Sequence, residues 1–535
     1  MSATQGCVYG IGLATQGSEP AGVAQMGFKA YNLRRLADCR LPVPQAFVLG
    51  TDWCARNRLD RDGARNALRE ALPAWIRRLE QASGLAFGSE RKPLLVSVRS
   101  GAPVSMPGMM DTLLDVGLTH RTLRGMVRLT GNPRLAWDSY RRLVQQYAQI
   151  VHGADASPYD EIVDDVVAKA RVASARELDF DSLRALATRC LGLFEEQVGS
   201  PFPQDPREQL EAAAVAVLDS WQSQRARDFR RLQGIDEDLG TAVTIQRMVF
   251  GNCGGTSGSG VGFTRDPSTG DDRIYLDFVF NAQGEDVVSG RHMVTDTARL
   301  AQALPELAAR LESLRVELES LFGDAQEFEF TVQEGKLYIL QTRSAKCSPW
   351  AALRIAVDQV AQGLVTPARA LERLRALDLP AIERRLLVAR EVPALAAAEP
   401  ASAGLASGAI ALDATSCERL ARTGHAAILV RSETSTDDIG AIALASGVLT
   451  ARGGRTSHAA VVARQLGKVC LVGCKALSLD EHAHTIRFGD RVLHEGDTIC
   501  LDAERGLVYE GAPEVRVERP TKLIEQVRSW GGASA

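Results

Sequence analysis

The sequence predicts a protein of the mixed α/β (α+β) class with more than one domain. Its 535 residues are enough for two to four domains, each with its own apolar core. Helical periodicity dominates residues 120–235 and 350–392, whereas residues 241–345 show the alternation that is typical of β-strands. Short strands and helices then alternate over residues 405–512, which favours a separate domain after an Ala/Pro-rich linker near residue 400.

The composition excludes several classes of protein. Hydrophobic residues make up 45% and charged residues 24%, with a net charge of -4, so no nucleic-acid-binding surface is expected. No apolar run reaches transmembrane length, and the N-terminus lacks the pattern of a secretory leader. The ten cysteines are scattered without a C-x-x-C pair, which favours core thiols over a metal site. We therefore expect a cytoplasmic protein with reduced thiols and no nucleic-acid or membrane partner.

Two cations near the N-terminus are candidate phosphate ligands. Lys29 follows Gly27 at the start of a predicted helix. Arg99 comes directly after a buried strand predicted at residues 94–98, and a strand that leaves the core tends to deliver its end residue into a cleft. Either side chain could equally be an ordinary surface charge.

A glycine-dense stretch, "FGNCGGTSGSGVGFTRDPSTG", occupies residues 250–270. Seven glycines alternate with hydroxyl residues, and such a loop can bring backbone N–H groups close to phosphate oxygens. The alternative is a mobile hairpin tip. The sequence contains neither a P-loop nor a Rossmann fingerprint, so this stretch does not predict a P-loop NTPase or a dinucleotide site.

A predicted hairpin, "EFEFTVQEGKLYILQTR", combines carboxylates, an amide and a guanidinium. Alternation places Glu327 and Glu329 on one face of the first strand, with Thr331. Gln341 and Arg343 share a face of the second strand. Oxygen ligands suit Mg²⁺ and the guanidinium fork suits phosphate, so the hairpin could hold a metal–polyphosphate group. The alternative is a solvated hairpin face.

One histidine stands between a glycine turn and a run of helix formers in "TARGGRTSHAAVVARQLGKVCLVG", residues 450–473. Thr456 or Ser457 would cap the helix, which leaves His458 in its first turn. A helix N-terminus offers free N–H donors and partial positive charge, so it would stabilise a phosphoryl group on that imidazole. The alternative is a capped helix with an incidental histidine.

Longer stretches of the sequence resemble the pyruvate, phosphate dikinase family. The nucleotide-binding half of that family is matched by "GFKAYNLRRLADCRLPVPQAF", "LLVSVRSGAPVSMPGMMDTLLDVGL", "NPRLAWDSYRR", "FPQDPREQL", "TAVTIQRMVFGN", "TSGSGVGFTRDPSTG", "NAQGEDVVSG" and "EGKLYILQTR". The segment "GVLTARGGRTSHAAVVARQLGKVCLVGC" is similar to the family's phosphohistidine segment. The matches run in family order over about residues 20–512.

The resemblance implies four regions. An ATP-grasp-like nucleotide-binding domain is expected over residues 1–345, with a helical insert at about 120–235. A helical and Ala/Pro-rich linker would follow at 346–404, and then a swivelling β/β/α phosphohistidine domain at 405–512. Residues 513–535 would form a frayed C-terminal tail.

The resemblance also implies the site residues. His458 would be the phosphorylated catalytic histidine, aided by Arg99 and Arg343, and Thr456 is a candidate regulatory residue. Glu329 and Gln341 would hold Mg²⁺. Gly258 and Gly260 would belong to a loop that covers the phosphates, and Arg141 or Arg142 would contribute to the phosphate site. The nucleotide ligands expected from these matches are Lys29, Arg99, Gly108, Arg142, Gly258, Gly260, Glu329, Gln341 and Arg343.

The family's reaction implies the partners. His458 would take the β-phosphoryl group of ATP, AMP would leave, and inorganic phosphate would carry away the terminal phosphoryl group as pyrophosphate. The family continues into a (β/α)₈ barrel, which needs at least ~200 residues. Only 23 residues follow Ala512 here, so we expect pyruvate to be held on a separate barrel subunit of a split enzyme. The alternatives are a synthase-like or antibiotic-type phosphotransferase that uses water or another small acceptor, and a regulatory phosphocarrier without turnover.

Overall fold

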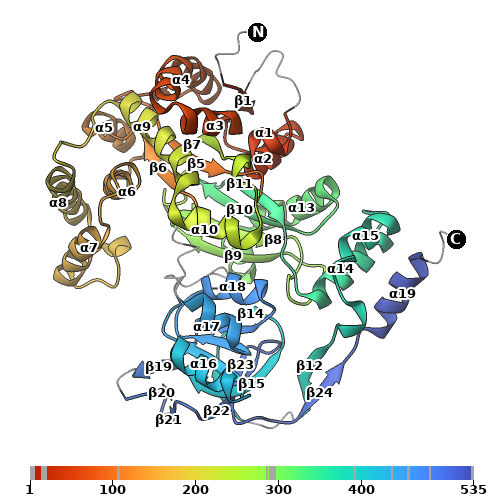
Figure 1. Cartoon of the computed structure of the whole chain (residues 1–535). Coiled ribbons are helices and arrows are strands. Elements are labelled where there is room, and N and C mark those ends of the chain that lie inside the picture. Colours follow the sequence, from red (N-terminus) through yellow and green to blue (C-terminus); the bar gives the residue numbers. More distant parts are fainter. Residues whose placement is uncertain are drawn as a thin grey trace. The chain divides into compact units, whose positions relative to one another are not determined.

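The chain folds into two compact units of mixed helix and sheet (Figure 1). The first comprises residues 1–253 with 338–341, and the second comprises residues 254–337 with 342–535. The structure is a computed structural model that describes residues 6–13, 21–104, 106, 109–284, 287, 297–388, 393–434, 438–454, 458–480 and 483–531. Within these ranges, no helix is both long enough and apolar enough to cross a membrane.

The first unit is built on a five-stranded sheet in which every pair of neighbours is antiparallel. Strand β2 is apolar and buried throughout, and β7 is buried up to Gln246 although it carries polar residues. The strands, in spatial order, are β1 (Val8–Ile11), β2 (Ala46–Leu49), β7 (Ala242–Arg247), β5 (Val96–Gly101) and β6 (Thr112–Val116). A separate short pair joins β3 (Ala86–Phe87) to β4 (Pro93–Leu94).

Ten helices among the described residues accompany this sheet. Those from α5 to α10 occupy the segment in which the helical insert was predicted, and α6 packs against the edge strand β6 (Figure 1). Asn132 caps α6 and Pro133 begins it, an arrangement in which the missing proline N–H costs no hydrogen bond. The helices are α1 (Val23–Met26), α2 (Phe28–Asp38), α3 (Thr51–Leu59), α4 (Arg61–Ser83), α5 (His120–Thr130), α6 (Pro133–His152), α7 (Ser157–Ala170), α8 (Phe180–Val198), α9 (Pro206–Asp219) and α10 (Gln224–Gln233).

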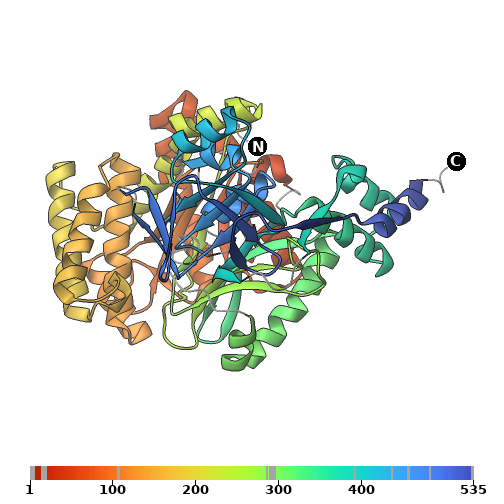
Figure 2. The same cartoon turned by 90° about the horizontal axis from the view of Figure 1, so that it is seen from below.

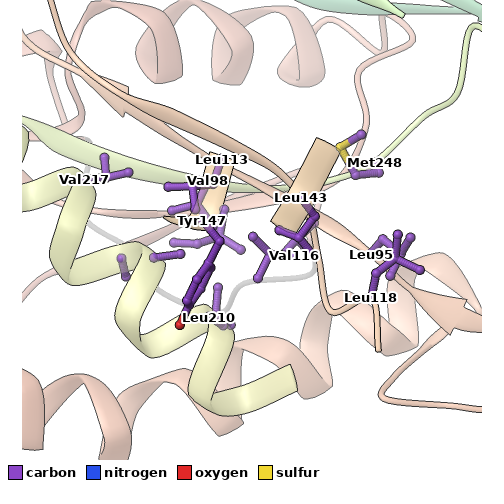
Figure 3. Packing of buried hydrophobic residues seen from close by; sticks show 14 of the residues in the cluster. Leu95, Val98, Leu113, Val116, Leu118, Leu143, Tyr147, Leu210, Val217 and Met248 are labelled. Carbon is purple, nitrogen blue, oxygen red and sulfur yellow. The ribbon is translucent and has the colours of Figure 1, made fainter. Parts of the chain in front are cut away.

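The core of the first unit lies between the sheet and helices α6 and α9 (Figure 3). Apolar side chains of β5 and β6 meet those of the two helices there, and each fully buried Leu or Val contributes about 1.5–3 kcal/mol to stability. The labelled members of this cluster are Leu95, Val98, Leu113, Val116, Leu118, Leu143, Tyr147, Leu210, Val217 and Met248.

The second unit begins with a four-stranded antiparallel sheet, of which only residues 338–341 of the edge strand belong to the first unit. Its strands, in spatial order, are β11 (Lys336–Ser344), β10 (Gln326–Gln333), β8 (Gly258–Phe263) and β9 (Tyr275–Phe280). The sequence predicted only strands over residues 241–345, and this was wrong for α12 (Thr297–Ala303) and α13 (Pro305–Phe322). Helix α13 begins at a proline and buries leucines at helical spacing, namely Leu307, Leu311, Leu314 and Leu318.

The glycines predicted to form a phosphate loop lie inside a strand instead. Gly258, Gly260 and Gly262 occupy alternate positions of β8 and are buried. A Cβ at these three positions would meet a phenylalanine ring atom at 2.2, 2.6 and 2.4 Å, respectively, from Phe278, Phe330 and Phe328. The glycines therefore admit aromatic rings onto one face of the sheet, and the predicted loop is wrong for Gly258 and Gly260.

The third part of the fold is an eight-stranded mixed sheet in the second unit, here called the C-terminal module (residues 393–511). Neighbours from β15 to β18 run parallel, and the other pairs run antiparallel. The strands, in spatial order, are β13 (Ala394–Ala397), β23 (Leu507–Glu510), β22 (Thr498–Asp502), β15 (Leu405–Ala411), β16 (Ala427–Arg431), β17 (Gly447–Thr450), β18 (Val469–Val472) and β14 (Glu399–Ser402).

Three helices and a small sheet complete this module. The helices are α16 (Ala414–Arg422), α17 (Ile439–Leu444) and α18 (His458–Gln465), and the small sheet joins β19 (Leu477–Asp480), β20 (Thr485–Phe488) and β21 (Arg491–His494). Since β13 and β14 belong to the eight-stranded sheet, the predicted linker extends too far at its C-terminal end. The linker composition misled because Ala and Pro can also occupy edge strands, and β14 is such an edge.

A helical arm joins the two ends of the C-terminal module. Helix α19 (Thr521–Gly531) packs on α14 (Pro349–Ala361) and α15 (Pro367–Leu374), and it lies beside them in both views (Figure 1 and Figure 2). Strands β12 (Arg384–Leu387) and β24 (Val515–Glu518) pair antiparallel and lead into and out of the module. The predicted frayed tail is therefore wrong up to Gly531, because Ile524 and Val527 are buried against the arm.

Candidate functional site

Lys29 lies at the start of α2, beside the end of strand β5. Gly27 caps the helix with a positive φ of 73°, and a Cβ there would meet the carbonyl oxygen of Gly101 at 1.8 Å. The amide of Phe28 donates to the carbonyl of Ala102 at 2.9 Å. Glycine at position 27 thus lets the helix start touch the strand end. The contact brings Lys29 close to Gly101, which lies two residues after Arg99 in β5.

Arg99 lies within β5 and not at its end, where the sequence placed it. Its neighbours across the sheet are Thr112 of β6 and Thr244 of β7, so these three side chains share one face. The structure thus brings Lys29 and Arg99, two of the predicted phosphate ligands, to the same end of the first-unit sheet. Arg99 shares a polar face with the two threonines, which the apolar pattern of residues 94–98 did not indicate.

Arg142 is held by an aspartate that the sequence did not single out. Asp138, one turn earlier in α6, accepts from Arg142 Nε at 2.9 Å and from Arg141 Nη2 at 2.8 Å. Burial alone would raise the pKa of Asp138, but the two guanidinium groups lower it to about 2. The carboxylate is therefore ionised at every physiological pH, and it fixes both arginines, of which Arg141 is the more buried.

In the second unit, Arg343 meets the predicted carboxylates. Its Nη2 donates to Glu327 Oε1 at 2.6 Å, and both side chains are mostly buried. Burial lowers the pKa of the guanidinium, but Glu327 and Glu329 raise it overall. Of the predicted cluster, the structure joins Glu327 and Arg343 directly, and the Glu329 carboxylate is close enough to raise the pKa of the guanidinium. We call the face that carries these groups the front face of the sheet.

A further carboxylate, Asp277, lies on the same face and was not predicted as a site residue. Val261 of β8 pairs with Asp277 on one side and with Glu329 on the other, so the two acids stand in one row across the sheet. Asp277 is only 2% exposed. An aspartate between leucine and phenylalanine in an otherwise apolar strand, "YLDFVF", is the signal that would have found it.

The donor chemistry fits a magnesium–phosphate group better than an all-protein metal cage. Among the described residues, no group of three or more His, Cys, Asp or Glu side chains is placed to hold a metal ion. Mg²⁺ commonly takes only one or two carboxylates and completes its shell with water and substrate phosphates. Glu329 and Asp277 provide such oxygens on the front face, whereas Glu327 is engaged by Arg343. Gln341, in β11, is buried.

His458 is the first residue of α18. The preceding strand β17 stands in the parallel part of the sheet, and ligands bind at the carboxyl ends of such strands. The connection is anchored there, since the amide of Ala451 donates to the carbonyl of Arg431 at the end of β16 at 3.1 Å, and the amide of Arg452 donates to the carbonyl of Ser432 at 2.9 Å. The predicted helix is present from His458 onward within the described residues. Thr456 and Gly108 lie outside the described residues.

Comparisons with family models match two segments of the chain. A family model described as "Pyruvate phosphate dikinase, AMP/ATP-binding domain" matches residues 64–310. A second, described as "PEP-utilising enzyme, mobile domain", matches residues 423–506, which include His458. The first match covers helices α5 to α10 of the first unit and the glycine strand β8, and the second lies within the C-terminal module.

Curated relatives match nearly the whole chain. The protein named pyruvate, phosphate dikinase from Clostridium symbiosum is 40% identical over 511 residues, which are 94% of this chain and 58% of that protein. Its namesake from Entamoeba histolytica is 40% identical over 92% of this chain and 56% of that protein. A chloroplastic namesake from Flaveria pringlei is 39% identical over 94% of this chain and 53% of that protein. The chain therefore spans somewhat more than half the length of these relatives.

Proposed function

We propose that this chain, which belongs to the pyruvate, phosphate dikinase family, phosphorylates its own His458 from the β-phosphate of ATP. The observation that carries the proposal is the position of His458 in the first described turn of a helix that follows a parallel strand. The free N–H groups of a helix start favour an anion, so a phosphoryl group on this residue would be stabilised. AMP would leave in the step in which the histidine attacks, and the β- and γ-phosphoryl groups would remain on the histidine as a pyrophosphoryl group.

The cations would neutralise the polyphosphate. Lys29 and Arg99 come from neighbouring elements of the first unit, and Arg343 comes from the front face of the second-unit sheet. Glu327 and Asp138 would keep Arg343 and Arg142 in fixed orientations, which lowers the entropy lost when phosphate binds. Phosphoryl transfer is catalysed mostly by such positioning and charge stabilisation. We assign no phosphate contact to Gly258 or Gly260 themselves, because both are buried in β8, and the turn before β8 would serve as the lid.

Glu329 and Gln341 are the proposed residues for Mg²⁺. When bound, Mg²⁺ would neutralise charge on the phosphate oxygens and align them for displacement. Both residues offer oxygen ligands, which Mg²⁺ prefers. Glu329 is better suited than Glu327, because the Glu327 carboxylate already accepts from Arg343.

The second half of the reaction concerns the acceptors. Inorganic phosphate would take the terminal phosphoryl group and yield pyrophosphate, and phosphohistidine would then pass its phosphoryl group to pyruvate. Pyruvate is proposed because the relatives are named pyruvate, phosphate dikinase. A pyruvate site on a separate subunit stays a prediction, to be tested by adding candidate barrel proteins to phosphorylated enzyme. Transfer to water or to another small acceptor would appear in the same assay as loss of label without phosphoenolpyruvate.

The direct test uses ATP that is labelled at either the β- or the γ-position. β-Label should remain on the protein in an acid-labile, base-stable form with release of AMP, and γ-label should leave as pyrophosphate when phosphate is added. His458→Asn removes the imidazole and should lose all label while it retains ATP binding. His425→Asn, an exposed histidine of the same module, is the matched control. A stable γ-label with ADP as product would contradict the proposal.

A further inference from the structure

Arg464 connects two parts of the second unit. It stands near the end of α18, six residues after His458, and its Nη2 and Nε donate to the carbonyl oxygen of Ala401 at 2.7 and 3.2 Å. The same guanidinium carbon lies 5.3 Å from the centre of the Phe263 ring in β8. One side chain therefore contacts both its own module, through β14, and the four-stranded sheet.

A second contact reinforces this junction. The hydroxyl of Tyr275, in edge strand β9, donates to the carbonyl oxygen of Pro400 at 3.2 Å. Tyr275 and Phe263 are direct neighbours across β8 and β9, and their rings meet edge to face at 5.9 Å. Consecutive carbonyl groups of β14 thus accept from the sheet and from Arg464, so the aromatic pair and the arginine form one continuous contact.

The position of this contact along the sheet connects it to the front face. Phe263 pairs with Tyr275 on one side and with Glu327 on the other, so Arg464 covers the ring next to Glu327. Glu327 is the residue that holds Arg343. Six residues of helix correspond to about 9 Å along its axis. Arg464 contacts the sheet beside the Glu327–Arg343 pair. The start of α18 therefore lies within about two helical turns of that contact, measured along the helix axis.

We propose that Arg464 is a positioning residue that docks α18 onto the Phe263–Tyr275 pair while His458 accepts its phosphoryl group. Because Phe263 is only 1% exposed, the cation–π contact is shielded from water and is stronger than it would be on the surface. The contact has no covalent component, so it can form and break in each cycle. The kinetic part of this proposal rests on the proposed histidine phosphotransfer, whereas the docking itself does not.

Docking is tested without any chemistry by hydrogen–deuterium exchange of peptides that cover β9, the edge strand of the sheet. Arg464→Met keeps the unbranched stem and removes the guanidinium, so β9 should exchange about tenfold faster, whereas peptides from β5 should be unaffected. Arg464→Lys keeps the charge and should restore part of the protection. Tyr275→Phe alters the sheet side alone and should accelerate exchange about threefold. Arg422→Met, an exposed arginine of the same module, is the matched control.

The kinetic arm measures single-turnover labelling of His458 from β-labelled ATP at saturating ATP. Arg464→Met should label about tenfold more slowly with an unchanged ATP dissociation constant, and Arg422→Met should label normally. Faster exchange in β14 and α18 alone, with β9 at the wild-type level, would overturn docking. Faster exchange in β9 with a normal labelling rate would overturn the positioning role. A wild-type protein that takes no label would contradict the proposed phosphotransfer, and the exchange of β9 would still decide the docking.

Discussion

The two antiparallel sheets that carry the predicted ATP residues obtain their charged groups in different ways. In the first unit the cations come from separate elements: Lys29 from α2, Arg99 from β5 and Arg142 from α6. In the second unit the charges lie on adjoining strands of one hairpin, β10 and β11, where Glu327 and Arg343 form an ion pair. The first arrangement exists only when the unit has folded, whereas the second follows from local alternation.

This difference indicates which substitutions should disturb the charged residues of each unit. The first-unit cations depend on close backbone approaches, such as that of Gly27 to Gly101, and on a carboxylate that holds arginines. The second-unit charges depend on the three glycines of β8, because this strand must admit phenylalanine rings on the face opposite the carboxylates. Substitutions should therefore act through different mechanisms in the two units.

The largest effect is expected for Arg99→Ala and Arg343→Ala. Each removes a cation that would contact the polyphosphate, and a charge-assisted contact contributes about 1.5–3 kcal/mol, so labelling of His458 should fall roughly ten- to a hundredfold. Single-turnover labelling measures this fall, with Arg121→Ala as an exposed control. If labelling of His458 fell in only one of the two variants, the phosphate ligands would lie on one sheet alone. That result would contradict the proposal that both sheets supply them.

A smaller effect is expected for Gly260→Ala. The added Cβ would stand 2.6 Å from both the Phe330 ring and the carbonyl oxygen of Asp277, and such overpacking costs about 1–3 kcal/mol of unfolding free energy. Urea unfolding measures the difference. Gly255→Ala, in the turn before β8, meets nothing within 4 Å and should be close to neutral. Equal stability of the two variants would refute the role of β8 as a ring-admitting strand.

The smallest effect is expected in the pH dependence of Asp138→Asn. The folded-state pKa of Asp138, about 2, lies below the unfolded value of 3.8, so its stabilisation is fully present above pH 4 and is lost as the pH falls toward 2. The stability gap between wild type and variant should narrow by about 1 kcal/mol from pH 6 to pH 3. Urea titrations at both pH values measure it, with Asp228→Asn on the exposed face of α10 as control. A gap that is constant with pH would mean that the arginines do not depend on this carboxylate.

The parts of the site that could be predicted from the sequence are those with a short-range pattern. Alternation gave the shared face of Glu327 and Glu329, and the Glu334–Gly335 pair marked the hairpin turn, in which both residues have positive φ. The helix start at His458 followed from its neighbours. These features depend on a few adjacent residues, so they can be predicted from the sequence.

The errors have the opposite cause. The glycines of β8 resembled a loop, and only the rings of β9 and β10, distant in sequence, explain why a strand needs them. Asp138 escaped notice because its partners lie one turn away on a helix that is otherwise ordinary. The spacing of four apolar residues does indicate helix α19, namely Leu523, Ile524, Val527 and Trp530. The glycines at the end of the chain instead suggested a frayed tail.

The pairing of β12 with β24 has a consequence for how such a protein can be taken apart. Leu387 and Val515 face each other in this ladder, and the amide of Val388 donates to the carbonyl oxygen of Glu514 at 3.0 Å. The C-terminal module is thus an insertion whose entry and exit are neighbours, so removing it leaves two ends that a short turn can join. Because its two ends are neighbours, the excised module is also suited to circularisation. The remaining arm is suited to receiving a different inserted domain, so the module can be exchanged as one piece.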